Sequence, residues 1–345
     1  MSVVSFKHWL LPMLSAWLLA GPVLAAEVNL YSARQENLIK PLLERFSEQT
    51  GIEVNLVTGK ADALLQRLKS EGRNSPADLL LTTDAGRLHR AREAGVLAPV
   101  ESDTLHERIP AQYRDPEGYW FGLSVRARPI VYVTDRVEPG ELSTYEALAD
   151  PKWKGRVCIR SSSNIYNQSL VASMIAHHGV EATEAWARDF VANFARPPIG
   201  GDRDQVLAAA AGQCDVAVIN TYYLGVMINE DDQEQREAAG RVAVFWPNQE
   251  GSGDGRGTHV NVSGIGLTAA AGNRDNAVQL MEFLSSDESQ AWYAQVNHEY
   301  PVRESVPVSD TLKAWGGFKA DDLDLHLLGK YNAEAVRLMD RAGWK

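Results

Sequence analysis

The chain has 345 residues, and its 45 acidic residues outnumber its 34 Lys and Arg residues, which gives a formal net charge of −11. This acidic balance argues against a nucleic acid or an anionic membrane surface as a partner, because both attract basic surfaces. The length is sufficient for two domains.

The first segment has the pattern of a cleavable signal peptide. Lys7 and His8 form a weakly basic start, an apolar run covers residues 9–20, and small or apolar residues occupy positions 23–25. The run is shorter than the roughly 18 to 20 apolar residues of a membrane span. We therefore predict that residues 1–25 are removed and that the mature chain is periplasmic, without stable insertion in the membrane.

Strand and helix patterns alternate after this segment. Alternating or buried apolar runs predict strands at residues 28–31, 52–57 and 79–82, and apolar spacings of three and four residues predict helices at 38–50, 61–71 and 85–94. This order is typical of a parallel sheet flanked by helices, so the predicted class is α/β.

The second half repeats the α/β order after an unusually long extended segment. Residues 120–133 are long enough to cross between two lobes, and residues 242–246 and 260–267 form a second extended pair that returns the chain. Two α/β lobes joined in this way hold a ligand in the cleft between them.

Three tyrosines occur where a predicted strand gives way to a helix. Tyr222 and Tyr223 follow an apolar strand at 216–219, and Tyr166 follows a strand at 157–159 through a Ser-Ser-Ser-Asn turn. Buried tyrosines usually pack a ring and bond one hydroxyl. At equivalent strand-to-helix turns, however, they lie where α/β proteins bind ligands, so we predict that their hydroxyls converge.

Converging phenols favour a hard, highly charged cation. A free phenol ionises only near pH 10 or so, but a bound cation stabilises the phenolate. Ferric iron matches anionic oxygen ligands, and three phenolates neutralise its charge.

Three oxygens do not fill an octahedral site. Arg34 follows the first strand and Arg126 lies on the long extended segment. Either arginine is expected to hold a small anion, such as carbonate or bicarbonate, that completes the coordination. The alternative for both is an ordinary salt bridge.

The chain contains two cysteines, Cys158 and Cys214, each in or just before a strand that leads to a tyrosine site. In an oxidising compartment they are candidates for a disulfide. Two buried thiols are the alternative, whereas the spacing is wrong for zinc.

Motifs for catalysis do not occur in the sequence. It has no His-Glu-x-x-His or Gly-x-Ser-x-Gly segment, and the glycine-rich residues 251–257 lack the Lys-Ser/Thr of a P-loop. His259 and His298 lie near candidate cleft strands and are secondary candidates. We therefore do not expect an enzyme. The competing hypothesis is a carrier for a small organic or oxyanionic solute held by Arg34 and Arg126.

Several specific segments carry a family resemblance. They include Asn29-Leu30-Tyr31-Ser32-Ala33-Arg34, Asn164-Ile165-Tyr166-Asn167-Gln168-Ser169 and Asn220-Thr221-Tyr222-Tyr223. On these segments, residues 28–343 resemble the periplasmic ferric-ion-binding proteins of ABC iron importers, especially the cyanobacterial-type branch. The resemblance assigns Tyr166, Tyr222 and Tyr223 as Fe³⁺ ligands. It also implies a monomer that delivers iron to an inner-membrane ABC permease with its ATPase.

The resemblance implies a two-lobe clamshell of the periplasmic-binding-protein type, type II-like and transferrin-like. We assign residues 26–126 and 250–300 to the N-terminal lobe, and 127–249 and 301–345 to the C-terminal lobe. Family members often place a His, a Tyr or both just after the first-strand arginine, but this chain has Gln35-Glu36-Asn37 there. The N-terminal lobe is therefore expected to supply no iron ligand, or only Glu36.

Overall fold

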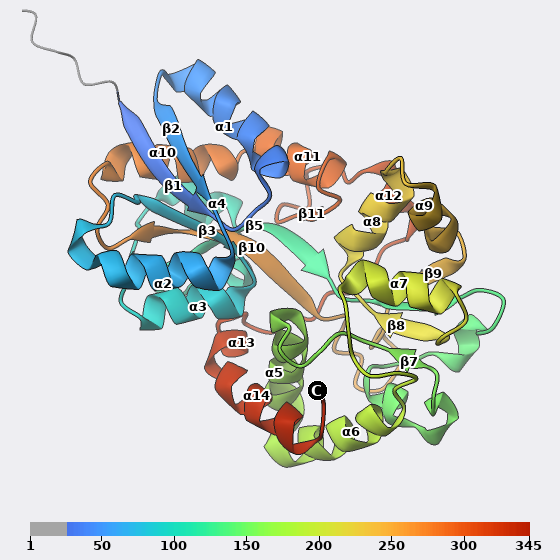
Figure 1. Cartoon of the computed structure of the whole chain (residues 1–345). Coiled ribbons are helices and arrows are strands. Elements are labelled where there is room, and N and C mark those ends of the chain that lie inside the picture. Colours follow the sequence, from blue (N-terminus) through green and yellow to red (C-terminus); the bar gives the residue numbers. More distant parts are fainter. Residues whose placement is uncertain (1–25) are drawn as a thin grey trace, which may run out of the picture.

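The computed structural model describes residues 26–345, so the predicted signal peptide lies outside the described residues. Two separate sheets organise this part of the chain, the first on the left and the second on the right of Figure 1. The predicted α/β class is confirmed by the alternating order of strands and helices.

The first sheet has the order β11-β5-β10-β3-β1-β2, with β4 paired to β10. Strands β1, β2 and β3 run parallel to one another, whereas β10 runs antiparallel to β3 and β5. The bounds are β1 (Glu27–Ser32), β2 (Glu53–Thr58), β3 (Leu79–Thr83), β4 (Leu97–Ala98), β5 (Phe121–Ala127), β10 (Val260–Thr268) and β11 (Tyr300–Pro301).

Six helices pack around this sheet, and together they form what we call the first lobe. They are α1 (Glu36–Thr50), α2 (Ala61–Glu71), α3 (Ala85–Glu93), α4 (Asp103–Arg108), α10 (Arg274–Leu284) and α11 (Asp287–Gln295). In α1 the buried stripe is Ile39, Leu42, Leu43 and Phe46, and Gly51 ends the helix in the left-handed region with φ 73°.

The second sheet has the order β7-β8-β6-β9. Its strands are β6 (Ile130–Val133), β7 (Val157–Cys158), β8 (Val216–Val218) and β9 (Val242–Phe245). With α5 (Ile165–His178), α6 (Val180–Ala192), α7 (Asp202–Ala210), α8 (Thr221–Asn229), α9 (Gln233–Ala239), α12 (Asp310–Ala314) and α14 (Asn332–Arg341), this sheet forms the second lobe. β7 and β8 are parallel neighbours, so the turns that follow them lie side by side.

Within residues 26–345 the chain crosses between the lobes three times, from β5 to β6, from β9 to β10 and from β11 to α12. The first two crossings lie at the two extended pairs predicted from the sequence. A short helix, α13 (His326–Lys330), also contacts both α3 of the first lobe and α5 of the second, and it lies between these two helices in Figure 1. One continuous apolar core includes strand residues of both sheets, such as Leu30 and Val216. The lobes are therefore packed together along one side.

In the first sheet, β5 ends at Ala127 and β11 at Pro301. The precise lobe boundaries stay a prediction. No helix within residues 26–345 is both long enough and apolar enough to cross a membrane.

Candidate metal-binding site

A cavity of about 440 Å³ lies between the lobes, and all three predicted tyrosines line it. The first lobe contributes the residues around the start of α1 and the connection from α11 to β11, and the second contributes one face of α8 and the first turn of α5.

The tyrosines occupy matching positions on two helices. Tyr166 is the second residue of α5, and Tyr222 is the second residue of α8. The N-cap residue Asn164 fixes the start of α5, because its side chain accepts a hydrogen bond from the backbone N–H of Tyr166 at 3.2 Å. Parallel pairing of β7 with β8 then sets the two helix starts beside each other.

The hydroxyls of the two helices meet directly. Tyr222 Oη donates a hydrogen bond to Tyr166 Oη at 3.3 Å. The Tyr223 ring lies against that of Tyr222, with ring centroids 4.2 Å apart and planes inclined by 33°. The structure thus brings together Tyr166, Tyr222 and Tyr223, as the sequence predicted.

The three phenols have different tendencies to ionise. Burial alone would raise the pKa of Tyr166, but the guanidinium of Arg126 and the hydrogen bond from Tyr222 lower it below the ordinary value. Burial and the neighbouring Tyr166 raise the pKa of Tyr222 well above that value. Burial, Tyr166 and Asp202 raise the pKa of Tyr223 to about 12. The lower pKa of Tyr166 makes it the easiest of the three to ionise, whereas the raised pKa values of Tyr222 and Tyr223 keep both protonated at neutral pH.

Arg126 is the buried charge beside this cluster. Its guanidinium carbon lies 5.4 Å from the centroid of the Tyr166 ring, and its Nη2 donates to the carbonyl of Val262 at 2.6 Å. Its Nε and Nη1 atoms have no hydrogen-bond partner in the described part of the chain. The residues that line the cavity do not include Arg126.

Arg34, in contrast, lines the cavity but is already paired. Its Nη2 donates to Glu299 at 2.8 Å and to Ser124 at 3.3 Å, and both members of the ion pair are nearly fully buried. The salt bridge that the sequence left open as an alternative is what the structure shows at Arg34.

Glu36 lies at the surface as the first residue of α1. Its carboxylate pairs with Lys40 at 3.0 Å, and it is not among the residues lining the cavity. Its neighbours Gln35 and Asn37 line the cavity instead. The structure therefore does not bring Glu36 to the tyrosines.

A buried ionic network that the sequence did not predict supports the tyrosine turns. The carboxylate of Asp202 pairs with Arg160 at 2.6 Å and Arg128 at 3.2 Å, and it also accepts from the backbone N–H of Asn220 at 3.0 Å. Asn220 directly precedes the first residue of α8. The network thus orients the turn that presents Tyr222.

The two secondary histidine candidates behave differently. His298 lines the cavity, whereas His259 does not. Burial lowers the pKa of His259 to about 3, so this ring is neutral and enclosed.

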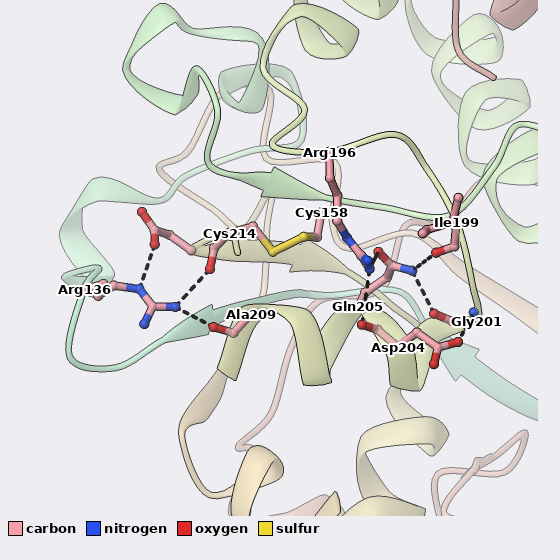
Figure 2. The surroundings of a disulfide bond; sticks show 10 residues. Arg136, Cys158, Arg196, Ile199, Gly201, Asp204, Gln205, Ala209 and Cys214 are labelled. Atoms are coloured by element: carbon pink, nitrogen blue, oxygen red, sulfur yellow. Dashed lines mark hydrogen bonds and ion pairs between the residues drawn. A yellow bond between two sulfur atoms is a disulfide. The ribbon is translucent and has the colours of Figure 1, made fainter. Parts of the chain in front are cut away.

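A disulfide joins Cys158 to Cys214, both buried, with the Cα atoms 5.8 Å apart (Figure 2). Cys158 ends β7 and Cys214 precedes β8 by two residues. Each cysteine stands eight residues before a tyrosine, Tyr166 and Tyr222 respectively. The disulfide therefore links equivalent points of the two units that carry the tyrosines. Figure 2 also shows Arg136 bonded to the carbonyls of Ala209 and Cys214 beside it.

This fold and site define a two-lobe solute-binding protein. Residues 42–320 match the family of bacterial extracellular solute-binding proteins, and the chain belongs to that family. Within residues 26–345 no group of three His, Cys, Asp or Glu side chains is placed to hold a metal ion.

Several similar proteins are named for iron uptake or described with bound iron. The chain is 53% identical over 319 residues to iron uptake protein A1 of Synechocystis sp. (strain ATCC 27184 / PCC 6803 / Kazusa). The aligned residues cover 92% of this chain and 88% of that protein. A Trichodesmium IdiA (FutA) structure in complex with iron and citrate superimposes with a TM-score of 0.90 at 50% identity, over 93% of this chain and 100% of that one. Apo FutA2 from Synechocystis gives a TM-score of 0.88 at 46% identity, with 93% and 100% covered. These similarities confirm the two-lobe fold and the predicted resemblance to periplasmic ferric-binding proteins.

Proposed function

We propose that the protein captures Fe³⁺ in the periplasm and delivers it to an inner-membrane ABC permease driven by its ATPase. The single observation that carries this proposal is the 3.3 Å contact between the hydroxyls of Tyr166 and Tyr222, with Tyr223 stacked beside them in the interlobe cavity. The names of the similar proteins, which describe iron uptake and ferric binding, support it. The protein acts as a monomeric binding protein and not as an enzyme.

Three phenolates suit this cargo because of charge and hardness. Oxygen anions are the ligands that hard cations prefer, and three of them cancel the charge of Fe³⁺. Two of the phenols keep their protons at neutral pH because burial raises the pKa of both. A divalent ion gains less from each phenolate and so is less able to displace these protons.

A synergistic anion, such as carbonate or bicarbonate, completes the coordination. Arg126 is the better anchor of the two arginines, because its Nε and Nη1 both lack partners in residues 26–345 and it has no ion pair there. Arg34 also has an Nε without a partner, but its guanidinium is held in an ion pair with Glu299. An anion close to Arg126 also offsets the repulsion between its guanidinium and the iron. In the similar Trichodesmium protein the recorded ligands are iron and citrate.

The test is a titration of the purified mature protein with ferric citrate in the presence of bicarbonate. Phenolate bound to ferric iron absorbs visible light by charge transfer, so a visible band should grow and saturate at one iron per chain. Calorimetry with sulfate, phosphate and polyamines in the absence of metal tests the competing hypothesis, a carrier for small solutes. Tight binding of any of these solutes, with no visible band, would replace the ferric proposal by the carrier for small solutes.

A further inference from the structure

Three residues other than glycine adopt a left-handed backbone in residues 26–345, namely Asp84, Asn248 and His298, with φ of 86°, 58° and 52°. Such conformations are uncommon for residues with a Cβ, and they persist where the surroundings fix them. Two of the three, Asp84 and His298, belong to the first lobe and contact the helices that carry the tyrosines.

Asp84 contacts α5 from the first lobe. It follows β3 and caps α3, where its carboxylate accepts from the N–H of Gly86 at 2.8 Å. Both carboxylate oxygens also lie 2.9 Å from Ser169 Oγ on α5, and one accepts from Asn261 at 2.8 Å. This fully buried contact joins the two lobes.

His298 contacts α8 in a different way. It lies between α11 and β11, and its side chain packs on the bare backbone of Gly225. A Cβ added at Gly225 would lie 2.6 Å from His298 Cβ and 2.8 Å from its Cγ, which leaves no room for a side chain there. Glycine is unfavourable inside a helix, so its occurrence at this position of α8 fits the close approach of the histidine.

The two contacts occupy equivalent places. Ser169 is three residues after Tyr166, and Gly225 is three residues after Tyr222. Residues three apart lie on the same side of a helix, one turn from each other. Asp84 and His298, the two non-glycine residues of the first lobe with positive φ, therefore each contact a tyrosine-bearing helix one turn C-terminal to its tyrosine.

We infer that Asp84 and His298 are positioning residues that hold α5 and α8 from the opposite lobe and so keep the tyrosine hydroxyls together. This inference rests on the proposed function and adds how the lobes retain the metal. We expect both contacts to slow the release of iron, because they hold the tyrosine-bearing helices against the first lobe.

The first test introduces a methyl group at the histidine contact. Gly225→Ala should accelerate iron release to a chelator about tenfold, the size expected when one buried contact is lost. The wavelength of the charge-transfer band should stay unchanged, because all three tyrosines remain. The matched control is Gly240→Ala, whose added Cβ meets only ordinary contacts at 3.5 Å.

A second substitution separates this contact from general disturbance of α8. His298→Gly removes the side chain that the new methyl would strike, so the double variant with Gly225→Ala should release iron more slowly than Gly225→Ala alone. If the effects of the two single variants simply multiply in the double variant, the two residues are not coupled and the inference is wrong.

The aspartate contact is tested by Ser169→Ala, which removes the donor but keeps Asp84 bonded to Gly86 and Asn261. Iron release should again accelerate by about tenfold, as expected for a hydrogen bond to a buried carboxylate. Ser173→Ala is the control, since Ser173 is equally buried on α5 but donates only to Leu170 within the helix.

The inference is overturned if Gly225→Ala and Ser169→Ala both release iron at rates within about twofold of their controls. If the wild-type protein develops no charge-transfer band, the proposed function fails on its own. The positions of the lobes are then measured without iron by small-angle X-ray scattering. A larger radius of gyration for Gly225→Ala than for Gly240→Ala supports the positioning role, and equal radii reject it.

Discussion

The two walls of the interlobe cavity are built from different chemistry. The second lobe presents three phenols, two of which hydrogen-bond only weakly to each other at 3.3 Å. The first lobe presents Arg34, which is bound to Glu299, and a histidine packed on a helix. The second lobe therefore carries phenols available to a metal. On the first-lobe wall Arg34 is paired with Glu299, whereas Asn297 and His298 have polar side-chain atoms without partners among the described residues.

The difference begins at the turns after the strands. In the second lobe, β7 and β8 both lead into helices whose second residue is a tyrosine. In the first lobe the equivalent turn leads from β1 to α1, where Gln35 is the N-cap and Glu36 is the first helical residue. Glu36 pairs with Lys40. Under the proposed function, the second lobe supplies the metal ligands and the first lobe covers them.

Removing the adjacent phenols should have the largest effect. Tyr222→Phe with Tyr223→Phe deletes two of the three proposed anionic ligands and keeps both rings. Since even the supporting partners of a metal ligand are worth about 10- to 100-fold in affinity, we expect the double variant to lose at least about a thousandfold. Equilibrium competition with citrate measures this loss.

The control for that experiment is Tyr331→Phe, a tyrosine on the connection between α13 and α14 that does not line the cavity. It should keep both the colour and the affinity of the wild type. Retention of both by the Tyr222/Tyr223 variant as well would show that the second lobe is not the metal-binding wall.

Loss of the disulfide should weaken the fold much more than the site. The bridge spans 56 residues, and closing a loop of this length in the unfolded chain is worth about 4 kcal/mol of unfolding free energy. Cys158→Ser with Cys214→Ser should therefore lower the free energy of unfolding in urea by about that amount.

The same variant should keep most of its iron affinity, because the parallel pairing of Val157 with Val216 still aligns the two tyrosine turns. The measurement is iron competition well below the unfolding midpoint. A thousandfold loss of affinity in the folded variant, about as large as that of the tyrosine variant, would mean that the bridge itself aligns the site.

The second-lobe wall of the cavity, which carries Tyr166, Tyr222 and Tyr223 and is called the tyrosine wall below, was predictable because its cause is local in the sequence. An apolar strand, a polar turn and a helix start place Tyr166 and Tyr222 at the same end of neighbouring parallel strands. Two of the three interlobe crossings in the described residues, from β5 to β6 and from β9 to β10, were likewise visible as long extended segments. Helix α9 was not predicted, because Gln233–Ala239 is polar and has no apolar period.

The contacts of the first lobe could not be predicted in this way. Arg34 and its partner Glu299 are 265 residues apart, and Ser169 and Asp84 are 85 apart. The contact of Gly225 with His298 depends on a backbone approach between lobes. No local pattern encodes which of several arginines meets which carboxylate, so the sequence left Arg34 and Arg126 equivalent, although the structure separates them.

Iron binding should strengthen as the pH rises. The folded-state pKa values of Tyr222 and Tyr223 lie above the ordinary value, the latter at about 12, so both phenols are protonated at neutral pH. Iron must displace these protons, and each displaced proton changes the affinity about tenfold per pH unit. We expect about two to three protons released per iron, and an affinity that falls by about a hundredfold or more from pH 8 to pH 7.

Proton release is measured by adding ferric citrate to weakly buffered protein with a pH indicator, against a blank without protein. Release of fewer than two protons would show that Tyr222 and Tyr223 are not both phenolates in the complex. The tyrosine wall would then contribute fewer anionic ligands than proposed.

The two arginines should differ in their effect on the anion. Arg126→Gln removes the guanidinium that lowers the pKa of Tyr166. Two nitrogens of this guanidinium, Nε and Nη1, have no hydrogen-bond partner within residues 26–345. Added bicarbonate should then no longer tighten iron binding, and the affinity should fall about tenfold, as for loss of one charge-assisted contact.

Arg34→Gln is the matched comparison, since its guanidinium is occupied by Glu299. This variant should lose stability, because it leaves a buried carboxylate unpaired, but it should keep the response to bicarbonate. If Arg34→Gln and not Arg126→Gln abolishes that response, the anion binds on the first-lobe wall.

The smallest effect should come from Glu36→Gln. The side chain of Glu36 is exposed, pairs with Lys40 one turn along α1, and lies outside the residues that line the cavity. Exposed pairs of this kind contribute little, and no contact connects this carboxylate to the tyrosines. Iron affinity and proton release should therefore match the wild type within error in the same competition and indicator assays. A clear loss of affinity would mean that the start of α1 rearranges when iron binds, so that the first lobe supplies a carboxylate ligand and the two walls share the metal.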